Sequence, residues 1–170
     1  MILGMSISTF TVIHTVISLI AILAGIVVVY GMLTAKRLEG WTAFFLTTTV
    51  LTSVTGFFFP FAGVKPPHVV GAIALIVLAI TIPALYKYHL AGSWRWIYIV
   101  GAVISLYLNV FVAVVQAFQK LSFLKPLAPT QSELPFLVAQ LAVLALFIVL
   151  GIKAVKSFTP TPRTLAFSMV

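Results

Sequence analysis

Residues 96–119 read WIYIVGAVISLYLNVFVAVVQAFQ, a run of 24 residues without a charged side chain. Roughly 20 consecutive apolar residues are enough for a helix to cross the hydrocarbon core of a bilayer. A segment in lipid must also satisfy its own backbone hydrogen bonds, which favours a helix. This stretch therefore predicts a transmembrane helix, and the same reasoning extends to the rest of the chain.

Four further uncharged runs cover residues 1–35, 40–64, 66–86 and 134–152. They are longer than the strands of outer-membrane barrels and do not alternate in polarity. Together the five runs predict spans near residues 7–34, 41–61, 67–88, 95–118 and 134–155. The predicted fold is all-α: one transmembrane domain, residues 1–170, built as a five-helix bundle.

The composition agrees with this class and excludes several functions. Of the 170 residues 62% are hydrophobic and 7% charged, and the mean hydropathy is +1.25; about a quarter of a soluble domain is charged. The chain has no Cys, which excludes disulfides and thiolate metal sites. Its two acids are Glu39 and Glu133, so paired-carboxylate catalysis has almost nothing to work with. An enzyme is the least expected class.

The formal charge of +8 is explained by membrane topology. Loops on the cytoplasmic side of membrane proteins are enriched in Lys and Arg. Under the predicted spans one side carries seven basic residues: Lys36, Arg37, Lys87, Arg95, Lys153, Lys156 and Arg163. The other side carries Lys65, Lys120 and Lys125. The N-terminus is therefore predicted outside and the C-terminus in the cytoplasm. No contiguous basic face is present, so no nucleic-acid partner is expected.

Polar residues inside the predicted spans fall on one face of each helix. At 100° per residue, the fourth span places five of them within an arc of about 80°: Tyr98, Ser105, Asn109, Gln116 and Gln119. Such residues can hydrogen-bond neighbouring helices and act as packing contacts. Alternatively, they line a polar pocket in the outer half of the bundle. The candidate ligand-binding residues are His14, Thr52, Thr55, His68, Asn109, Gln116 and Gln140.

Two histidines add chemistry to this cluster. His14 lies about two turns into the first span, and His68 follows Pro66 and Pro67 at the outer start of the third. Two imidazoles from different helices can ligate haem iron, and imidazole also binds Zn or Cu. His14 and His68 are thus candidate metal ligands, although no Cys or carboxylate completes a set. A quinone that accepts a hydrogen bond from either imidazole is a further alternative. The simplest alternative is that both histidines hydrogen-bond to other groups of the protein and bind no ligand.

Two features of the predicted outer end have both a structural and a functional interpretation. Thr130-Gln131-Ser132-Glu133 matches the capping box of a helix start, and Ser132 is an alternative N-cap. In the functional interpretation, Glu133 instead closes a site with His14 or His68. Phenylalanines also gather there, either as packed core or as a contact surface for a partner or an apolar ligand. They are Phe57, Phe58, Phe59, Phe61, Phe118, Phe123 and Phe136.

Three stretches resemble a known group of proteins. They are SVTGFFFPFAGVKPPH at 53–68, YLNVFVAVVQAFQKL at 107–121 and APTQSELPFLVAQ at 128–140. The chain is similar, over most of its length, to a group of small uncharacterised multi-pass bacterial inner-membrane proteins. The resemblance implies a bacterial cytoplasmic membrane and supplies no site residues.

Three functions follow as hypotheses. The first is a binding or redox module that holds a haem, quinone or lipid-like ligand in the outer half of the bundle. The second is a small-solute transporter or channel, which needs a continuous polar path. The third is an accessory or scaffold subunit that contacts a membrane-protein partner or another copy of the chain.

Overall fold

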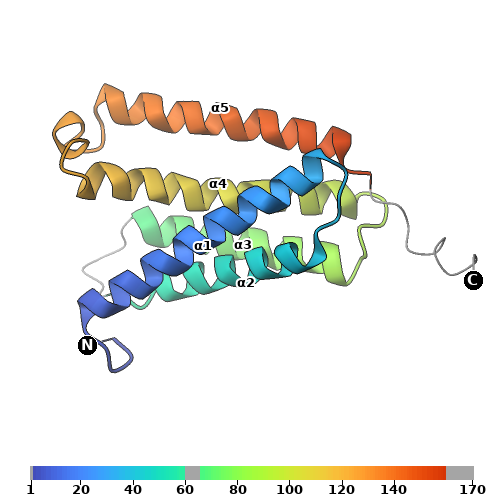
Figure 1. Ribbon diagram of the computed structural model, residues 1–170, viewed down its shortest axis with the longest axis horizontal. Coiled ribbons are helices and arrows are strands. Elements are labelled where there is room, and N and C mark those ends of the chain that lie inside the picture. Colours follow the sequence, from blue (N-terminus) through green and yellow to red (C-terminus); the bar gives the residue numbers. More distant parts are fainter. Residues whose placement is uncertain (1, 60–65, 160–170) are drawn as a thin grey trace, which may run out of the picture.

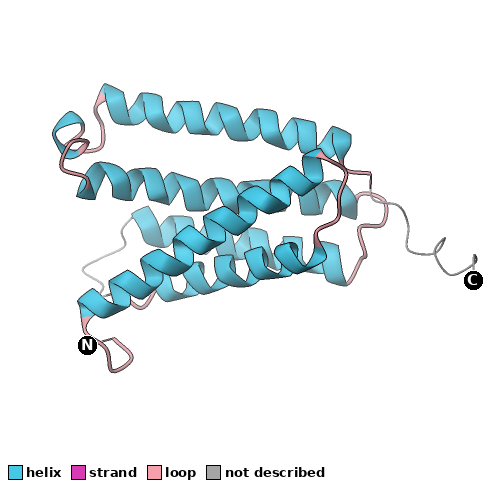
Figure 2. Cartoon of the chain, in the orientation of Figure 1, coloured by secondary structure: helices cyan, strands magenta, loops and turns pink. Residues whose placement is uncertain are grey.

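The computed structural model describes residues 2–59 and 66–159 (Figure 1). Its helices are α1 (Ile7–Leu33), α2 (Glu39–Gly56), α3 (Pro66–Tyr86), α4 (Trp94–Lys120) and α5 (Leu134–Ser157), with a short 3-10 turn, η1 (Lys125–Leu127). Within the described residues there is no β-strand, and Figure 2 shows helices and loops throughout. The all-helical prediction is therefore confirmed.

Four of these helices, α1, α3, α4 and α5, are long and apolar enough to cross a membrane. The helix that falls short is α2, which has 18 residues and carries six threonines and Glu39. The predicted second span, 41–61, thus corresponds to a helix that begins earlier and ends at Gly56, and residues 60 and 61 lie outside the described residues. The fourth helix is longer than predicted because it continues to Lys120, beyond the apolar run.

The helices lie side by side along the long axis, with α1 crossing the others obliquely (Figure 1). The most extensive contacts join α1 to α2, α3 to α4 and α4 to α5, so α4 is the central helix. In the most apolar 18-residue window of each helix, 44% of α4 is buried but only 11% of α5. Helix α5 therefore packs at the periphery and presents most of its apolar surface outward.

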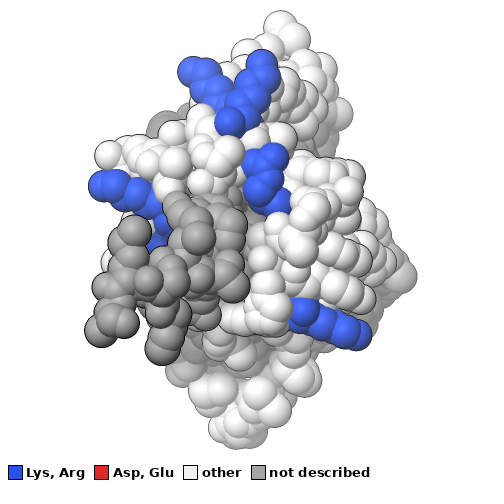
Figure 3. Space-filling view, turned by 90° about the vertical axis from the view of Figure 1, so that its right-hand side faces the viewer, with Lys and Arg blue, Asp and Glu red and all other residues white. Residues whose placement is uncertain are grey.

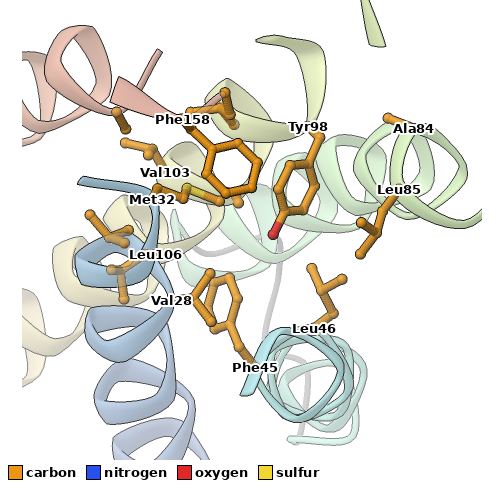
Figure 4. Packing of buried hydrophobic residues seen from close by; sticks show 14 of the residues in the cluster. Val28, Met32, Phe45, Leu46, Ala84, Leu85, Tyr98, Val103, Leu106 and Phe158 are labelled. Atoms are coloured by element: carbon orange, nitrogen blue, oxygen red, sulfur yellow. The ribbon is translucent and has the colours of Figure 1, made fainter. Parts of the chain in front are cut away.

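The core is concentrated toward the end of the molecule where α5 ends. Figure 4 shows Phe45 of α2 and Val28 of α1 facing Tyr98 of α4 and Phe158, which follows α5. Two glycines allow close helix approach, a role that small residues commonly play in membrane proteins. A Cβ on Gly25 would lie 2.6 Å from Leu106 Cδ1, and one on Gly101 would overlap the Thr81 hydroxyl.

Basic side chains gather at the same end as this core. The loops α1–α2 and α3–α4, the first turn of α4 and the end of α5 meet there, and they carry six of the basic residues predicted to be cytoplasmic (Figure 1). Figure 3 looks onto this end and shows Lys and Arg side chains spread across it, with no acidic side chain in view. Arg163 and Lys65, which also entered the orientation argument, lie outside the described residues.

Candidate functional site

A cavity of about 420 Å³ lies between α1, α2, α3 and α4. Its cause is the oblique course of α1: the helix touches α4 at Gly25, and its N-terminal half lies away from α4 and beside α2 (Figure 1). The cavity occupies the resulting wedge, and α3 completes the wall. Apolar surface dominates the lining, which includes Leu19, Ile22, Phe57, Phe59, Val70, Ala74, Leu108, Val112 and Ala113.

Most of the predicted site residues meet at this cavity. His14, Thr52, His68, Asn109 and Gln116 all line it, together with Thr11, Thr15, Ser18, Ser53 and Lys120. They come from four helices, α1 to α4, and Thr55 is not among the lining residues. Of the clustered phenylalanines, Phe57 and Phe59 line the cavity, and Phe118 instead packs edge-on against Phe136 of α5. Phe61 lies outside the described residues.

Thr55 takes part in this site through His14. Its hydroxyl lies 2.8 Å from His14 Nδ1, and the edge of the Phe59 ring faces the same imidazole at a centroid distance of 5.2 Å. The Thr55 hydroxyl also donates to the Leu51 carbonyl at 2.7 Å. A hydroxyl has one proton, so the oxygen accepts a hydrogen bond from His14 Nδ1–H. In the neutral ring, Nε2 is therefore left as an acceptor.

Asn109 and Gln116 differ in how they are satisfied. Asn109 Nδ2 donates to the Thr49 hydroxyl at 3.3 Å, which joins α4 to α2 below the cavity. Gln116, one turn before Lys120, is half-buried and makes no hydrogen bond within the described part of the chain. The Thr52 hydroxyl oxygen is buried and likewise lacks a partner among the described residues. Polar groups without partners in an apolar cavity are suited to contact a polar part of a ligand.

Gln140 lies elsewhere, and its predicted place in the pocket is not what the structure shows. The side chain is buried between α4 and α5, where Nε2 donates to the Phe111 carbonyl at 3.2 Å. The phase of α5 alone could not reveal this, because α5 packs on the face of α4 that points away from the cavity. Gln140 therefore fits the alternative of a packing contact between helices.

His68 lies in the first turn of α3, with its ring centroid 6.1 Å from that of Phe57. Both imidazoles thus border one cavity, as expected for the candidate ligands. Within residues 2–59 and 66–159, however, no group of three or more His, Cys, Asp or Glu side chains comes together as a metal site. Two imidazoles would suffice only for an ion whose other ligands come from elsewhere, as in haem.

Glu133 does not approach the cavity. Its Oε1 accepts hydrogen bonds from the Thr130 amide at 3.0 Å and the Thr130 hydroxyl at 2.8 Å, and Oε2 accepts one from the Ser132 amide at 3.1 Å. Helix α5 begins after Glu133, so neither Thr130 nor Ser132 is the N-cap that was predicted. Desolvation acts to raise the pKa of the carboxyl, but these hydrogen bonds together outweigh it and hold the pKa below its ordinary value.

A second cavity of about 280 Å³, which the sequence did not predict, lies at the basic end. Its walls include Lys36, Arg37, Thr42, Tyr98 and Phe158. The Tyr98 hydroxyl, part of the polar stripe of α4, lies 3.4 Å from the Thr42 hydroxyl. Different stretches of α1, α2 and α4 line the two cavities. Gly25, Phe45 and Leu106 pack together between these stretches and separate the cavities.

No family model, curated protein or solved structure matches this chain.

Proposed function

We propose that this protein is a multi-pass membrane protein that binds an apolar ligand with a polar head group, of lipid-like or quinone type, in the cavity between α1 and α4. The observation that carries the proposal is the lining: a cavity of about 420 Å³ with mostly apolar walls and a few convergent polar side chains. Small-molecule sites typically have volumes of about 300–1,000 Å³ and this balance of surfaces.

The proposed topology has five spans, with α2 as the second. At a rise of 1.5 Å per residue its 18 residues extend about 27 Å, close to the thickness of the hydrocarbon core. Two of its threonines, Thr48 and Thr55, need no water, since their hydroxyls donate to backbone carbonyls of their own helix. The gathering of basic residues at one end favours a cytoplasmic C-terminus and an external N-terminus. A bacterial cytoplasmic membrane rests on the resemblance alone.

Haem is the second candidate for the ligand, and one observation favours it. A metal-ligating imidazole usually donates its other ring N–H to an oxygen atom, and His14 does so toward Thr55 while keeping Nε2 for a ligand. An absorption spectrum of the purified protein decides this point: a Soret band would support haem, and its absence from protein reconstituted with haem would exclude it.

The outward face of α5 is the remaining candidate for a partner or a second copy of the chain. It carries Leu137, Val138, Leu141, Leu144, Ile148 and Ile152, all exposed in the monomer. A bilayer covers such a face as well as a protein does, so contact with lipid is sufficient to account for it.

The proposal is tested by filling the cavity. Ala113→Phe adds a ring inside it, and the matched control Ala142→Phe adds the same ring on the exposed side of α5. Purified proteins are extracted with solvent and the bound molecules counted by mass spectrometry. We expect one apolar species bound to the wild type and to Ala142→Phe but lost from Ala113→Phe. Equal retention by both variants would contradict the proposal.

A further inference from the structure

The rim of the large cavity carries positive charge and no acid. Lys120, at the last residue of α4, is the one Lys or Arg among the cavity-lining residues, and the lining contains no Asp or Glu. Within the described residues the ion pair that forms, between Arg37 and Glu39, lies at the opposite end of the molecule. The carboxylate of Glu133 is occupied by its own loop. Lys120 thus has no carboxylate partner in the described chain.

Two further polar side chains line the cavity together with Lys120. His14 of α1 lines the same cavity as Lys120 of α4. Gln116 precedes Lys120 by one helical turn, on the same face of α4, and its amide is unused within the described residues. The His14 ring is held through Nδ1 by Thr55, so Nε2 is the nitrogen left for a ligand. The three side chains together offer an ammonium group, a carboxamide that can donate or accept, and the acceptor nitrogen of the His14 ring.

This set matches a carboxyl group better than a neutral head. A carboxylate accepts hydrogen bonds from ammonium and amide donors, and such charge-assisted bonds are about twice as strong as neutral ones. The neutral His14 nitrogen makes no hydrogen bond to the ionised head and accepts one only from the protonated acid. One lysine balances one negative charge, whereas phosphate recognition commonly draws on bidentate arginine, and the cavity contains no Arg.

Building on the proposed function, we propose that the ligand is an amphiphile with a carboxyl head, of the fatty-acid class. The head lies between Lys120, His14 and Gln116 at the rim. The hydrocarbon chain follows the apolar wall that runs inward between α1 and α4, formed by Leu19, Ile22, Leu108 and Val112. A volume of about 420 Å³, near the lower limit for small-molecule sites, suits a single chain rather than a two-chain phospholipid.

The experiment compares an acid with its uncharged analogue. Radiolabelled palmitate and methyl palmitate are titrated at neutral pH against the full chain in phosphatidylcholine nanodiscs, and binding to empty discs is subtracted. We expect palmitate to bind about tenfold more tightly or better, the size of a hydrogen bond to a charged group. Lys120→Gln should reduce the affinity for palmitate to the affinity for methyl palmitate. The affinity for methyl palmitate itself should not change. Lys125→Gln, outside the cavity, is the matched control.

The outcomes separate this inference from the proposed function. Equal affinities for acid and ester, or equal effects of Lys120→Gln and Lys125→Gln, would overturn the carboxyl head while leaving a neutral ligand in the cavity. Both the carboxyl head and the ligand-binding cavity would be overturned by a combined result. In it, neither palmitate nor methyl palmitate binds saturably, and Ala113→Phe retains the same bound molecules as the wild type. Because Lys120 is exposed at the end of its helix, its replacement should not prevent folding.

Discussion

The hydrogen bond between His14 and Thr55 fixes one tautomer of the imidazole, and replacing Thr55 with Val tests this directly. Valine keeps the branched shape and removes the hydroxyl that accepts from Nδ1–H. Side-chain hydrogen bonds between membrane helices contribute about 0.6 kcal/mol on average and about 1.7 kcal/mol at most. The ratio of the two tautomers should therefore change by about threefold to sixteenfold toward Nε2–H.

The measurement is nitrogen NMR of ring-labelled histidine in detergent or nanodiscs, at a pH where the ring is neutral. Thr55→Ser retains the hydroxyl and should keep the wild-type tautomer. Thr52→Val removes a neighbouring hydroxyl of the cavity that makes no bond to His14, and should also have no effect on the ring. A wild-type ring protonated on Nε2, or identical spectra for Thr55→Val and wild type, would refute the assignment.

Three further predictions concern parts of the fold that lie outside the cavity. Gly101→Ala should lower the free energy of unfolding by about 1–3 kcal/mol, because the methyl overlaps a side chain of α3; Gly40→Ala, in open space, should not lower it in the same denaturant titration. Arg95→Gln should cost about 1.5–3 kcal/mol and speed hydrogen exchange at the end of α5, since its guanidinium donates to backbone carbonyls there. Because the pKa of Glu133 is lowered, its loop is stabilised above the ordinary value of 4.5 and loosens as the pH falls through the lower folded-state value. Hydrogen exchange of the Thr130 amide should show this loosening, and Glu133→Gln should abolish its pH dependence.

The helical class and the helix boundaries followed closely from the uncharged runs, because in lipid the backbone has few alternatives to a helix. The predictions were least accurate where polarity and helix formation diverge. Helix α4 continues two residues past its predicted end at residue 118, through Gln119 and Lys120, because Gln and Lys are good helix formers. Helix α2 is rich in threonine and therefore less apolar than its neighbours. It is nevertheless helical, and the hydroxyls of Thr48 and Thr55 donate hydrogen bonds to backbone carbonyls of the same helix.

The candidate site was predictable in part for a related reason. Helical phase tells which residues of one helix share a face, and this was sufficient for His14, Thr52, Asn109 and Gln116. Phase does not tell which neighbour the face contacts, so Gln140 was placed in the pocket although it packs between α5 and α4. The place of Lys120 in the cavity lining was not predicted, because a lysine at a helix end normally indicates the membrane surface.

The packing between the two cavities bears on the choice between binding and transport. A solute that crosses the protein along the polar stripe of α4 must pass the level of Ser105, which is fully buried. At that level Leu106 and Phe45 close around Gly25, and there is too little space even for one added methyl group. Passage would require α1 to separate from α4 along the part of its length where the two helices are in contact. Binding requires no such movement, because the cavity between α1 and α4 already exists where the N-terminal half of α1 diverges from α4. The same oblique course of α1 that creates the cavity therefore also closes it toward the basic end of the molecule, and this geometry favours a ligand that enters and leaves from one side.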